Sequence, residues 1–256
     1  MEVLAVITEF QDSATRFGGR CSAHFSQSLP PFRPITQHAD TTREGVCHYL
    51  AEQWIVDSAK DPDRFWRRMW KIPGVLNENF AAMIVMRAAE GPGTKRDWKL
   101  RYDTPAFEEG QYLIYNGFSV EPLFRWGPRR GGGIGDAAGS IVTECVSLAS
   151  GDPDSPRFAM ILASTCQADA LGRIIAHAIA VRVYSTGAVG VFDPNLGEFY
   201  FGAADQFEKW MEYVSQSFYK DFFTSYYVQS IAGPSGPLAM RSGGEARIPS
   251  AAQSED

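Results

Sequence analysis

The sequence has no surplus of positive charge, and this excludes one broad class of partners. Its 256 residues include 24 Lys and Arg against 30 Asp and Glu, which gives a formal net charge of −6. Because nucleic-acid binding requires an excess of Lys and Arg on one face, we expect no nucleic-acid partner. The sequence also lacks an apolar run approaching the roughly 20 residues that a membrane-spanning helix needs. Its first ten residues, MEVLAVITEF, lack the basic start of a cleavable secretion signal.

Cysteine is scarce, with four residues at positions 21, 47, 145 and 166. Four thiols in a chain of this length do not amount to a disulfide framework, so we expect them to be reduced. Cys21 and His24 have the short spacing of a zinc-binding pair, but a structural zinc site needs a second pair at regular spacing and none follows. The sequence therefore predicts neither a metal site nor a cofactor, and a single cysteine in a distinctive setting becomes a candidate nucleophile.

Composition divides the chain into three parts. Residues 1–38 mix Ser, Pro, Gly and Gln with scattered aromatic residues, and we predict a largely disordered leader there. Residues 232–256 are rich in Gly, Pro, Ser and charge, which predicts a disordered tail. The folded domain is expected between them, at residues 39–231, since the 45% share of hydrophobic residues is typical of a globular protein.

The two halves of this domain differ in periodicity. The first half has apolar residues at helical spacing, as at Val46, Leu50 and Trp54, whereas the second half has short apolar runs separated by Gly-containing turns. We expect helices at Glu44–Ser58, Asp61–Trp70, Asn77–Ala89 and Ala203–Phe218, and strands at Phe158–Ala163, Ile174–Tyr184, Val189–Phe192, Glu198–Phe201 and Phe222–Val228. Helices followed by antiparallel strands predict an α+β fold. The Gly-rich stretch Gly127–Ser140 lacks the lysine of a phosphate-binding loop, so we interpret it as a loop beside a cleft.

Cys47 occupies a position that favours an ionised thiol. It lies in TTREGVCHYL, where Thr41 and Glu44 resemble a capping box and place a helix N-terminus just before the cysteine. Unpaired N–H groups and the positive end of the helix dipole stabilise a thiolate there, and the thiolate is the nucleophilic form. A buried cysteine on an amphipathic helix is the alternative interpretation of the same pattern.

His177 and Asp193 are the candidate partners of this cysteine. His177 lies inside the apolar run IIAHAIAV, where an imidazole is costly to bury unless it has hydrogen-bond partners. Asp193 follows 16 positions later in VFDPNLGEF, and a strand, a turn and a second strand would bring its carboxylate beside the imidazole. The three groups then act as nucleophile, general base and orienting carboxylate. Two alternatives stay open, a core histidine with satisfied hydrogen bonds and an aspartate that merely starts a tight turn.

The order and spacing of these residues resemble those of papain-like cysteine proteases. Cys47 precedes His177 by 130 positions, close to the roughly 130–150 of the papain-type arrangement. The segments GVCHYLAEQW, HAIAV and FDPNLGEF resemble the YopT-type cysteine proteases, bacterial effectors with a papain-like fold, over roughly Gly45–Phe201. The resemblance implies that a helical first half carries the nucleophile Cys47, and that an antiparallel sheet in the second half carries His177 and Asp193 as the rest of the triad.

The resemblance also implies a reaction and a setting. It implies a cysteine endopeptidase that a bacterium secretes without a cleavable signal, and that cleaves a host protein in the cytosol or at the membrane of the host cell. The same thiol chemistry performs deamidation or transglutamination of glutamine on the same fold. A catalytically weak pseudo-protease that binds a host protein is a third alternative.

The positions before the cysteine depart from the papain-like pattern. Papain-like enzymes usually carry Gln or Asn five or six residues before the cysteine, where the amide donates to the oxyanion, whereas this sequence has Thr42 and Thr41 there. These hydroxyls, together with the Cys47 backbone N–H, are the candidate oxyanion donors. Loss of one good donor lowers the rate by roughly 10²–10³-fold, and this is the basis for the pseudo-protease alternative.

Gly18 and Cys21 form the last candidate site. Members of the family can trim their own leader and expose a glycine for acylation, and GGRCS matches the acylation pattern if a new N-terminus formed before Gly18. Cys21 would then be available for a second acyl chain, and two chains are needed for stable anchoring. We therefore expect membrane association only if the leader is processed and acylated.

Overall fold

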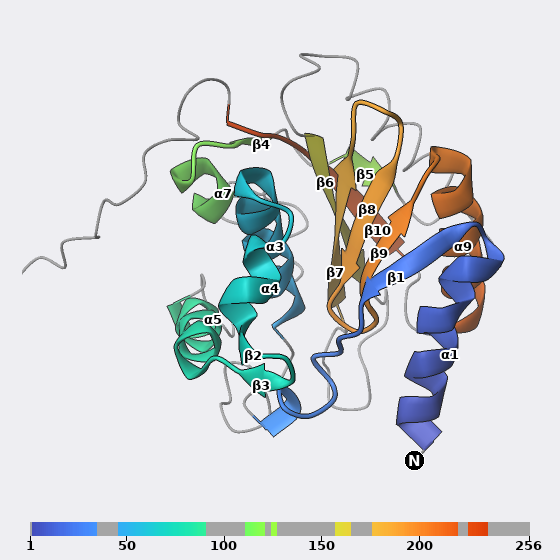
Figure 1. Ribbon diagram of the computed structural model, residues 1–256. Coiled ribbons are helices and arrows are strands. Elements are labelled where there is room, and N and C mark those ends of the chain that lie inside the picture. Colours follow the sequence, from blue (N-terminus) through green and yellow to red (C-terminus); the bar gives the residue numbers. More distant parts are fainter. Residues whose placement is uncertain are drawn as a thin grey trace, which may run out of the picture.

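A large antiparallel sheet lies between two groups of helices in the computed structural model (Figure 1). Helices α3, α4, α5 and α7 cover one face of the sheet, and α1 and α9 cover the other. The structure describes residues 2–34, 46–90, 111–120, 124–126, 157–164, 176–219 and 225–234. The predicted α+β fold class is confirmed.

The described elements are, in chain order, α1 (Glu2–Arg16), β1 (Gly19–Ala23), α3 (Cys47–Lys60), α4 (Arg64–Met69), β2 (Trp70–Ile72), β3 (Val75–Leu76), α5 (Glu78–Glu90), α7 (Gln111–Tyr115), β4 (Ser119–Val120), β5 (Phe124–Trp126), β6 (Arg157–Ser164), β7 (Ala176–Val183), β8 (Val189–Asp193), β9 (Gly197–Phe201), α9 (Ala204–Ser217) and β10 (Ser225–Ala232). They follow the predicted order, with helices before the central strands. The predicted loop Gly127–Ser140 and residues 235–256 of the predicted tail lie outside the described residues.

The sheet places β7 and β8, the strands of the candidate histidine and aspartate, at its centre. Its strand order is β1-β9-β8-β7-β6-β10-β4, and β5 also pairs with β10. Strands β6 to β9 pair with their neighbours in sequence, all antiparallel, with His177 opposite Ala163. Short turns join β7 to β8 and β8 to β9, as antiparallel neighbours allow. The predicted sheet of the second half is confirmed.

Alternation along β7 determines which side chains meet each helical layer. Ile179, Val181 and Val183 join the apolar cluster that includes α1 and α9, whereas Ala178 and Ala180 join the cluster that includes α3. The small alanine side chains allow α3 to pack closely on β7. This close packing brings the start of α3 to the middle of the sheet.

The N-terminal segment is folded, so the disordered leader predicted for residues 1–38 is wrong over residues 2–34. Helix α1 packs Phe10 into the cluster beside α9, and the Trp210 indole donates to the Ser13 hydroxyl at 3.0 Å. Strand β1 joins the sheet as the antiparallel partner of β9. Composition misled here because the Ser and Gln side chains of this segment form hydrogen bonds inside the fold.

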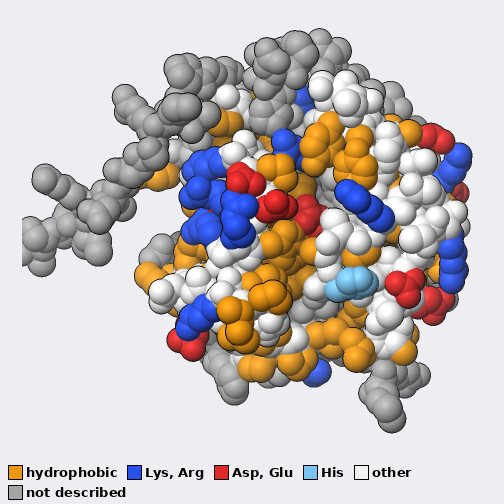
Figure 2. All heavy atoms as spheres, viewed as in Figure 1, with side chains coloured by type: hydrophobic (Ala, Val, Ile, Leu, Met, Phe, Trp, Pro, Cys, Tyr) orange, Lys and Arg blue, Asp and Glu red, His pale blue; other side chains and the backbone are white. Residues whose placement is uncertain are grey.

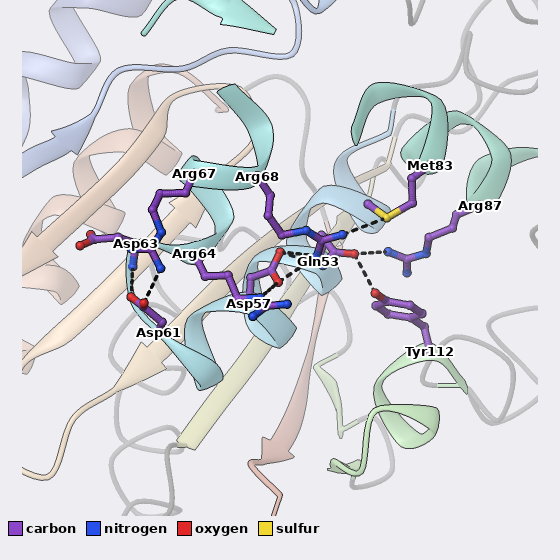
Figure 3. A network of polar contacts seen from close by, with 10 residues as sticks. All are labelled: Gln53, Asp57, Asp61, Asp63, Arg64, Arg67, Arg68, Met83, Arg87 and Tyr112. Atoms are coloured by element: carbon purple, nitrogen blue, oxygen red, sulfur yellow. Dashed lines mark hydrogen bonds and ion pairs between the residues drawn. The ribbon is translucent and has the colours of Figure 1, made fainter. Parts of the chain in front are cut away.

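A buried polar network holds the helical layer together (Figure 3). The Asp57 carboxylate on α3 accepts from Arg64 and Arg68 on α4, at 3.0 and 2.9 Å, and from Gln53 Nε2 at 2.8 Å. The side-chain amide oxygen of Gln53 in turn accepts from the Tyr112 hydroxyl on α7 at 2.7 Å.

In the space-filling view, Lys and Arg side chains over α3 and α4 lie beside acidic ones (Figure 2). These arginines therefore neutralise local carboxylates.

Replacing Phe10 by Ala tests whether α1 is an integral part of the fold. Phe10 is 7% exposed and Leu4, on the same helix, is 57% exposed. We expect Phe10→Ala to lower the free energy of unfolding by about 3–5 kcal/mol because it leaves a cavity in the core. The matched Leu4→Ala variant should cost about 0.5 kcal/mol or less. Urea denaturation measures both, and equal stability of the two variants would show that α1 is not docked.

Candidate active site

Cys47 is the first residue of α3 and lies against the end of a strand ladder. The side chain is buried, with 8% exposure, in the cluster that contains Ala178 and Ala180. The β7–β8 pairing ends at Ala180↔Phe192, and beyond it the backbone of Ala178 hydrogen-bonds to the Cys47 thiol. The helix N-terminus predicted just before Cys47 is confirmed.

The predicted capping box of Thr41 and Glu44 lies outside the described residues. The N-cap of α3 is Val46, and no side-chain hydrogen bond of its own caps the helix. Thr41 and Thr42, the predicted oxyanion donors, lie outside the described residues.

His177 faces the thiol on one side and a carboxylate on the other. The imidazole Nε2 lies 2.7 Å from Asp193 Oδ1, and the ring also hydrogen-bonds to the Cys47 side chain. Because Asp193 takes Nε2, Nδ1 is the ring nitrogen left to face the thiol. His177 therefore contacts Cys47 directly, and Asp193 is linked to Cys47 through His177. His177 is also a buried residue, 4% exposed, with satisfied hydrogen bonds.

The Asp193 carboxylate is buried and accepts three hydrogen bonds. Besides His177, it accepts from the backbone N–H of Asn195 at 2.8 Å on Oδ1 and from the Tyr219 hydroxyl at 2.7 Å on Oδ2. Asp193 also starts a tight turn, since the N–H of Leu196 donates to its carbonyl at 3.0 Å. The turn and the orienting carboxylate are thus two roles of one residue. The three donors offset the cost of removing the charge from water.

Glycine is required where this turn enters β9. Gly197 has φ of +112°, a left-handed conformation that residues with a Cβ rarely adopt. A Cβ there would also lie 2.3 Å from the carbonyl oxygen of Ala23, at the end of β1. The glycine of the FDPNLG segment therefore allows the N-terminal segment to pack against the turn that carries Asp193.

The electrostatics of the site place the proton on the imidazole. Burial disfavours the Cys47 thiolate, but the hydrogen bond and charge of His177, together with the Ala178 backbone, outweigh it and hold the pKa of Cys47 below its ordinary 9.0. Burial also disfavours an imidazolium, but the charge and hydrogen bond of Asp193 outweigh it, and the pKa of His177 rises from 6.5 to about 10. Of the two groups, the imidazole therefore holds its proton to higher pH than the thiol does.

Three residues of the site were missed at the level of sequence. Tyr219 lies just after α9, with its ring 5.5 Å from the His177 ring between centroids. Asn195 places its Nδ2 atom 3.5 Å from His177 Nδ1, and Gln27 donates to Asn195 Oδ1 at 2.9 Å. Asn195 stands inside the FDPNLG motif and could have been found there. Tyr219 and Gln27 carry no local signal, since only the fold brings them to the site.

The acylation candidates lie in the folded part of the N-terminal segment. Gly18 forms the turn between α1 and β1, with φ of +79°, and Cys21 lies inside β1. Half-burial raises the pKa of the Cys21 thiol to about 12, which leaves it unreactive at neutral pH. Cleavage before Gly18 would detach α1 from the sheet that it covers. No helix in the described part of the chain is long and apolar enough to cross a membrane.

Cys21 and His24 hold no zinc-like arrangement. His24 Nδ1 lies 2.8 Å from Gln11 Oε1. Among the residues that the structure describes, His, Cys, Asp and Glu side chains nowhere gather in threes as metal ligands do. The imidazole of His24 thus has a structural partner on α1.

Cys47, His177 and Asp193 thus form a candidate thiol site, and comparisons with known proteins relate the chain to cysteine proteases. The model of the peptidase family described as Yersinia/Haemophilus virulence surface antigen matches residues 162–225, which include His177 and Asp193 but not Cys47. The cysteine protease YopT1 of Yersinia enterocolitica is 25% identical to this chain over 202 residues. The predicted resemblance to the YopT-type cysteine proteases is therefore confirmed.

The extent of these matches is limited. The match to YopT1 covers 78% of this chain and 59% of the relative, so the chain spans less than two thirds of that protein's length. Among solved structures, the Pseudomonas avirulence protein AvrPphB matches with a TM-score of 0.47 and 14% identity, over 76% of this chain and 95% of that one. The cysteine protease-like domain of the Photorhabdus asymbiotica toxin PaTox matches with a TM-score of 0.41 and 12% identity, over 90% and 59%. Both structural likenesses are distant.

The pH dependence of Cys47 alkylation tests the ion pair. Alkylation consumes the thiolate, which is lost only as the pH falls through the pKa of the folded protein. Because that pKa lies below 9.0, Cys47 should react faster with iodoacetamide at neutral pH than an ordinary thiol does, since the thiolate fraction falls roughly tenfold for each pH unit below the pKa. Peptide mass spectrometry identifies the labelled residue.

Two controls accompany this measurement. Cys21, with a pKa of about 12, should stay nearly unlabelled at neutral pH. His177→Ala should move the alkylation midpoint of Cys47 to 9.0 or above, because burial remains while the cationic partner is lost. A wild-type midpoint at or above 9.0 would contradict the ion pair.

Replacing Tyr219 by Phe tests the support of the carboxylate. The variant keeps the ring beside His177 but leaves Asp193 Oδ2 without the hydroxyl donor. We expect the free energy of unfolding to fall by about 1–3 kcal/mol, the cost of an unsatisfied buried acceptor. Urea denaturation compares it with Tyr213→Phe, a residue that packs its ring against Phe10. Equal stability of the two variants would remove Tyr219 from the site.

Proposed function

We propose that the chain is a cysteine endopeptidase that cleaves a protein of a host cell. The observation that carries the proposal is the contact series from Cys47, at a helix N-terminus, through His177 to Asp193. A thiolate held beside an imidazolium is the ready form of a thiol nucleophile. The resemblance to a cysteine protease of Yersinia supports peptide bonds as the target.

The first half of the reaction forms an acyl-enzyme. The Cys47 sulfur attacks the carbonyl carbon of the scissile peptide, and the carbonyl oxygen takes up negative charge. As the C–N bond breaks, its electron pair remains on the nitrogen, which takes the proton from the His177 imidazolium. The amine product leaves, the thioester remains, and His177 is neutral. Asp193 holds the ring in the orientation that this transfer needs.

The second half restores the ion pair. Neutral His177 accepts a proton from a water molecule while the water oxygen attacks the thioester carbon. The C–S bond breaks, the thiolate leaves, and the acid product is released beside a newly formed imidazolium. The backbone N–H of Cys47, at the helix start, is the proposed oxyanion donor, with Thr41 and Thr42 as the side-chain donors.

The same relatives support a setting for the reaction. The family model names virulence surface antigens of Yersinia and Haemophilus. We propose that this chain is likewise a bacterial effector, secreted without a cleavable signal, that acts inside the host cell. The substrate is a host protein in the cytosol or at the membrane.

Cleavage of host proteins tests this function. Purified protein is incubated with a lysate of eukaryotic cells, and new protein N-termini are identified by terminal labelling and mass spectrometry. We expect a set of new N-termini that Cys47→Ala does not produce, because the nucleophile is absent. Asp193→Asn should reduce their rate of appearance by roughly 10²–10⁴-fold, the usual contribution of an oriented acid–base group.

Two outcomes would contradict the proposal. The first is the same set of new N-termini with wild type and with Cys47→Ala. The second is unbroken target chains whose glutamines each gain about 1 Da, which would indicate deamidation by the same thiol chemistry.

A further inference from the structure

Gln27 lies between the two parts of the candidate site and contacts both. Its Oε1 atom accepts the backbone N–H of Val46 at 3.2 Å, and its Nε2 atom donates to Asn195 Oδ1 at 2.9 Å. Its own backbone N–H donates to the carbonyl of Pro194 at 2.7 Å. The residue is 9% exposed. One buried side chain thus joins two segments that are far apart in the sequence.

The first of these segments is the start of the nucleophile helix. Val46 is the N-cap of α3, directly before Cys47, and α3 has no capping side chain of its own. The first N–H groups of a helix have no acceptor within the helix. The side-chain amide oxygen of Gln27, from a distant part of the chain, accepts a hydrogen bond from one of these groups, the N–H of Val46. This contact holds the N-cap residue of the helix in place.

The second segment is the turn that follows Asp193. Gln27 binds the carbonyl of Pro194 and the side chain of Asn195, whose Nδ2 atom lies 3.5 Å from His177 Nδ1 and 3.4 Å from the Tyr219 hydroxyl. This turn presents the carboxylate to the imidazole. The contacts of Gln27 therefore relate the position of the nucleophile to that of its acid–base partners.

The segment that carries Gln27 is held in the fold by aromatic packing before it and by a turn after it. Phe25, 6% exposed, packs its ring against Trp66 of α4 and Phe192 of β8, with centroid distances of 5.9 and 6.1 Å. After Gln27, the N–H of Leu29 donates to the carbonyl of Ser26 at 3.1 Å. Gln27 can therefore act as a fixed reference for the two segments that it joins.

We propose that Gln27 is a positioning residue, whose amide sets the start of α3 against the Asp193–Asn195 turn and so maintains the contact between the Cys47 thiol and His177. The inference rests on the proposed thiol chemistry of Cys47. It assigns the N-terminal segment a part in the function of the site, in addition to its part in the core. A purely structural glutamine would contribute to stability and leave the ionisation of Cys47 unchanged.

The test compares two buried glutamines under the same substitution. Gln27→Met keeps the approximate size of the side chain and removes both amide contacts. Gln53→Met does the same in the middle of α3, where the amide binds Asp57 and Tyr112 (Figure 3). Gln27→Met loses two side-chain hydrogen bonds, and Gln53→Met loses three, since Gln53 Oε1 also accepts from Arg87 at 3.5 Å. Only Gln27 touches the start of the helix and the turn. Urea denaturation and the pH profile of Cys47 alkylation by iodoacetamide are measured for each.

We expect Gln53→Met to be destabilised at least as much as Gln27→Met, and the two variants to differ in the ionisation of the Cys47 thiol. In Gln27→Met, alkylation of Cys47 at about pH 6 should fall by about tenfold, corresponding to a rise of about one unit in the pKa of the thiol. In Gln53→Met, the profile should stay within about twofold of wild type. Should Gln27→Met fail to fold, Gln27→Asn replaces it, since the shorter amide cannot reach both partners and must shift the profile in the same direction.

The outcomes separate this inference from the proposed function. A wild-type thiolate at neutral pH with an unchanged profile in the folded Gln27 variant would overturn the positioning role and leave the thiol chemistry intact. An equal shift in Gln53→Met would also overturn it, because the effect would then be a general loosening of α3. A wild-type Cys47 that titrates as an ordinary thiol would overturn both.

Discussion

The contact of His177 Nε2 with Asp193 Oδ1, 2.7 Å long and almost removed from water, determines how the candidate site behaves. An imidazolium buried alone would lose its proton, because a low-dielectric surrounding disfavours charge. The carboxylate reverses this preference, so the proton of the Cys47 thiol moves to the ring. The carboxylate in turn depends on the Tyr219 hydroxyl and the Asn195 N–H. The chemistry of the thiol is thus set by contacts that extend well beyond it.

The fold delivers these groups from three separate parts of the chain. The central strands supply the imidazole and the carboxylate, α3 supplies the thiol, and alanines on β7 allow the helix to approach the sheet. The N-terminal segment then completes the arrangement. It adds an edge strand to the sheet and a helix that covers one face of it. At Gln27 it contacts Val46 and Asn195, on the two sides of the site. A segment that reads as a leader by composition therefore contributes to both core and site.

The sequence allowed good prediction where the signal is local. Apolar runs with Gly-containing turns predicted β6 to β9, and helical spacing at Val46, Leu50 and Trp54 predicted α3. The contact between His177 and Asp193 could be predicted because a histidine in an apolar strand needs a partner. Prediction failed for α1 and β1, where polar side chains pair within the fold. The buried residues Ile7, Phe10 and Ala14 of α1 do follow helical spacing, which is a local signal for this helix.

Contacts between distant segments were beyond such reasoning. No periodicity indicates that the Tyr219 hydroxyl meets Asp193, or that Gln27 caps a helix that begins at Cys47. The contact of Gln27 with the N–H of Val46, at the start of α3, is of the same kind, since it joins segments that are far apart in the sequence. Local patterns specify elements, whereas the support of a site depends on their assembly.

The protonation state of His177 shows directly whether Asp193 keeps a proton on the buried imidazole. The protein has four histidines, and imidazole ¹⁵N NMR, with His177 assigned by comparison with a His177→Gln variant, follows the ring nitrogens as the pH is raised. The account predicts that His177 stays doubly protonated through neutral pH and loses its proton near pH 10, where its pKa lies. A ring that loses its proton near its ordinary pKa of 6.5 would contradict it.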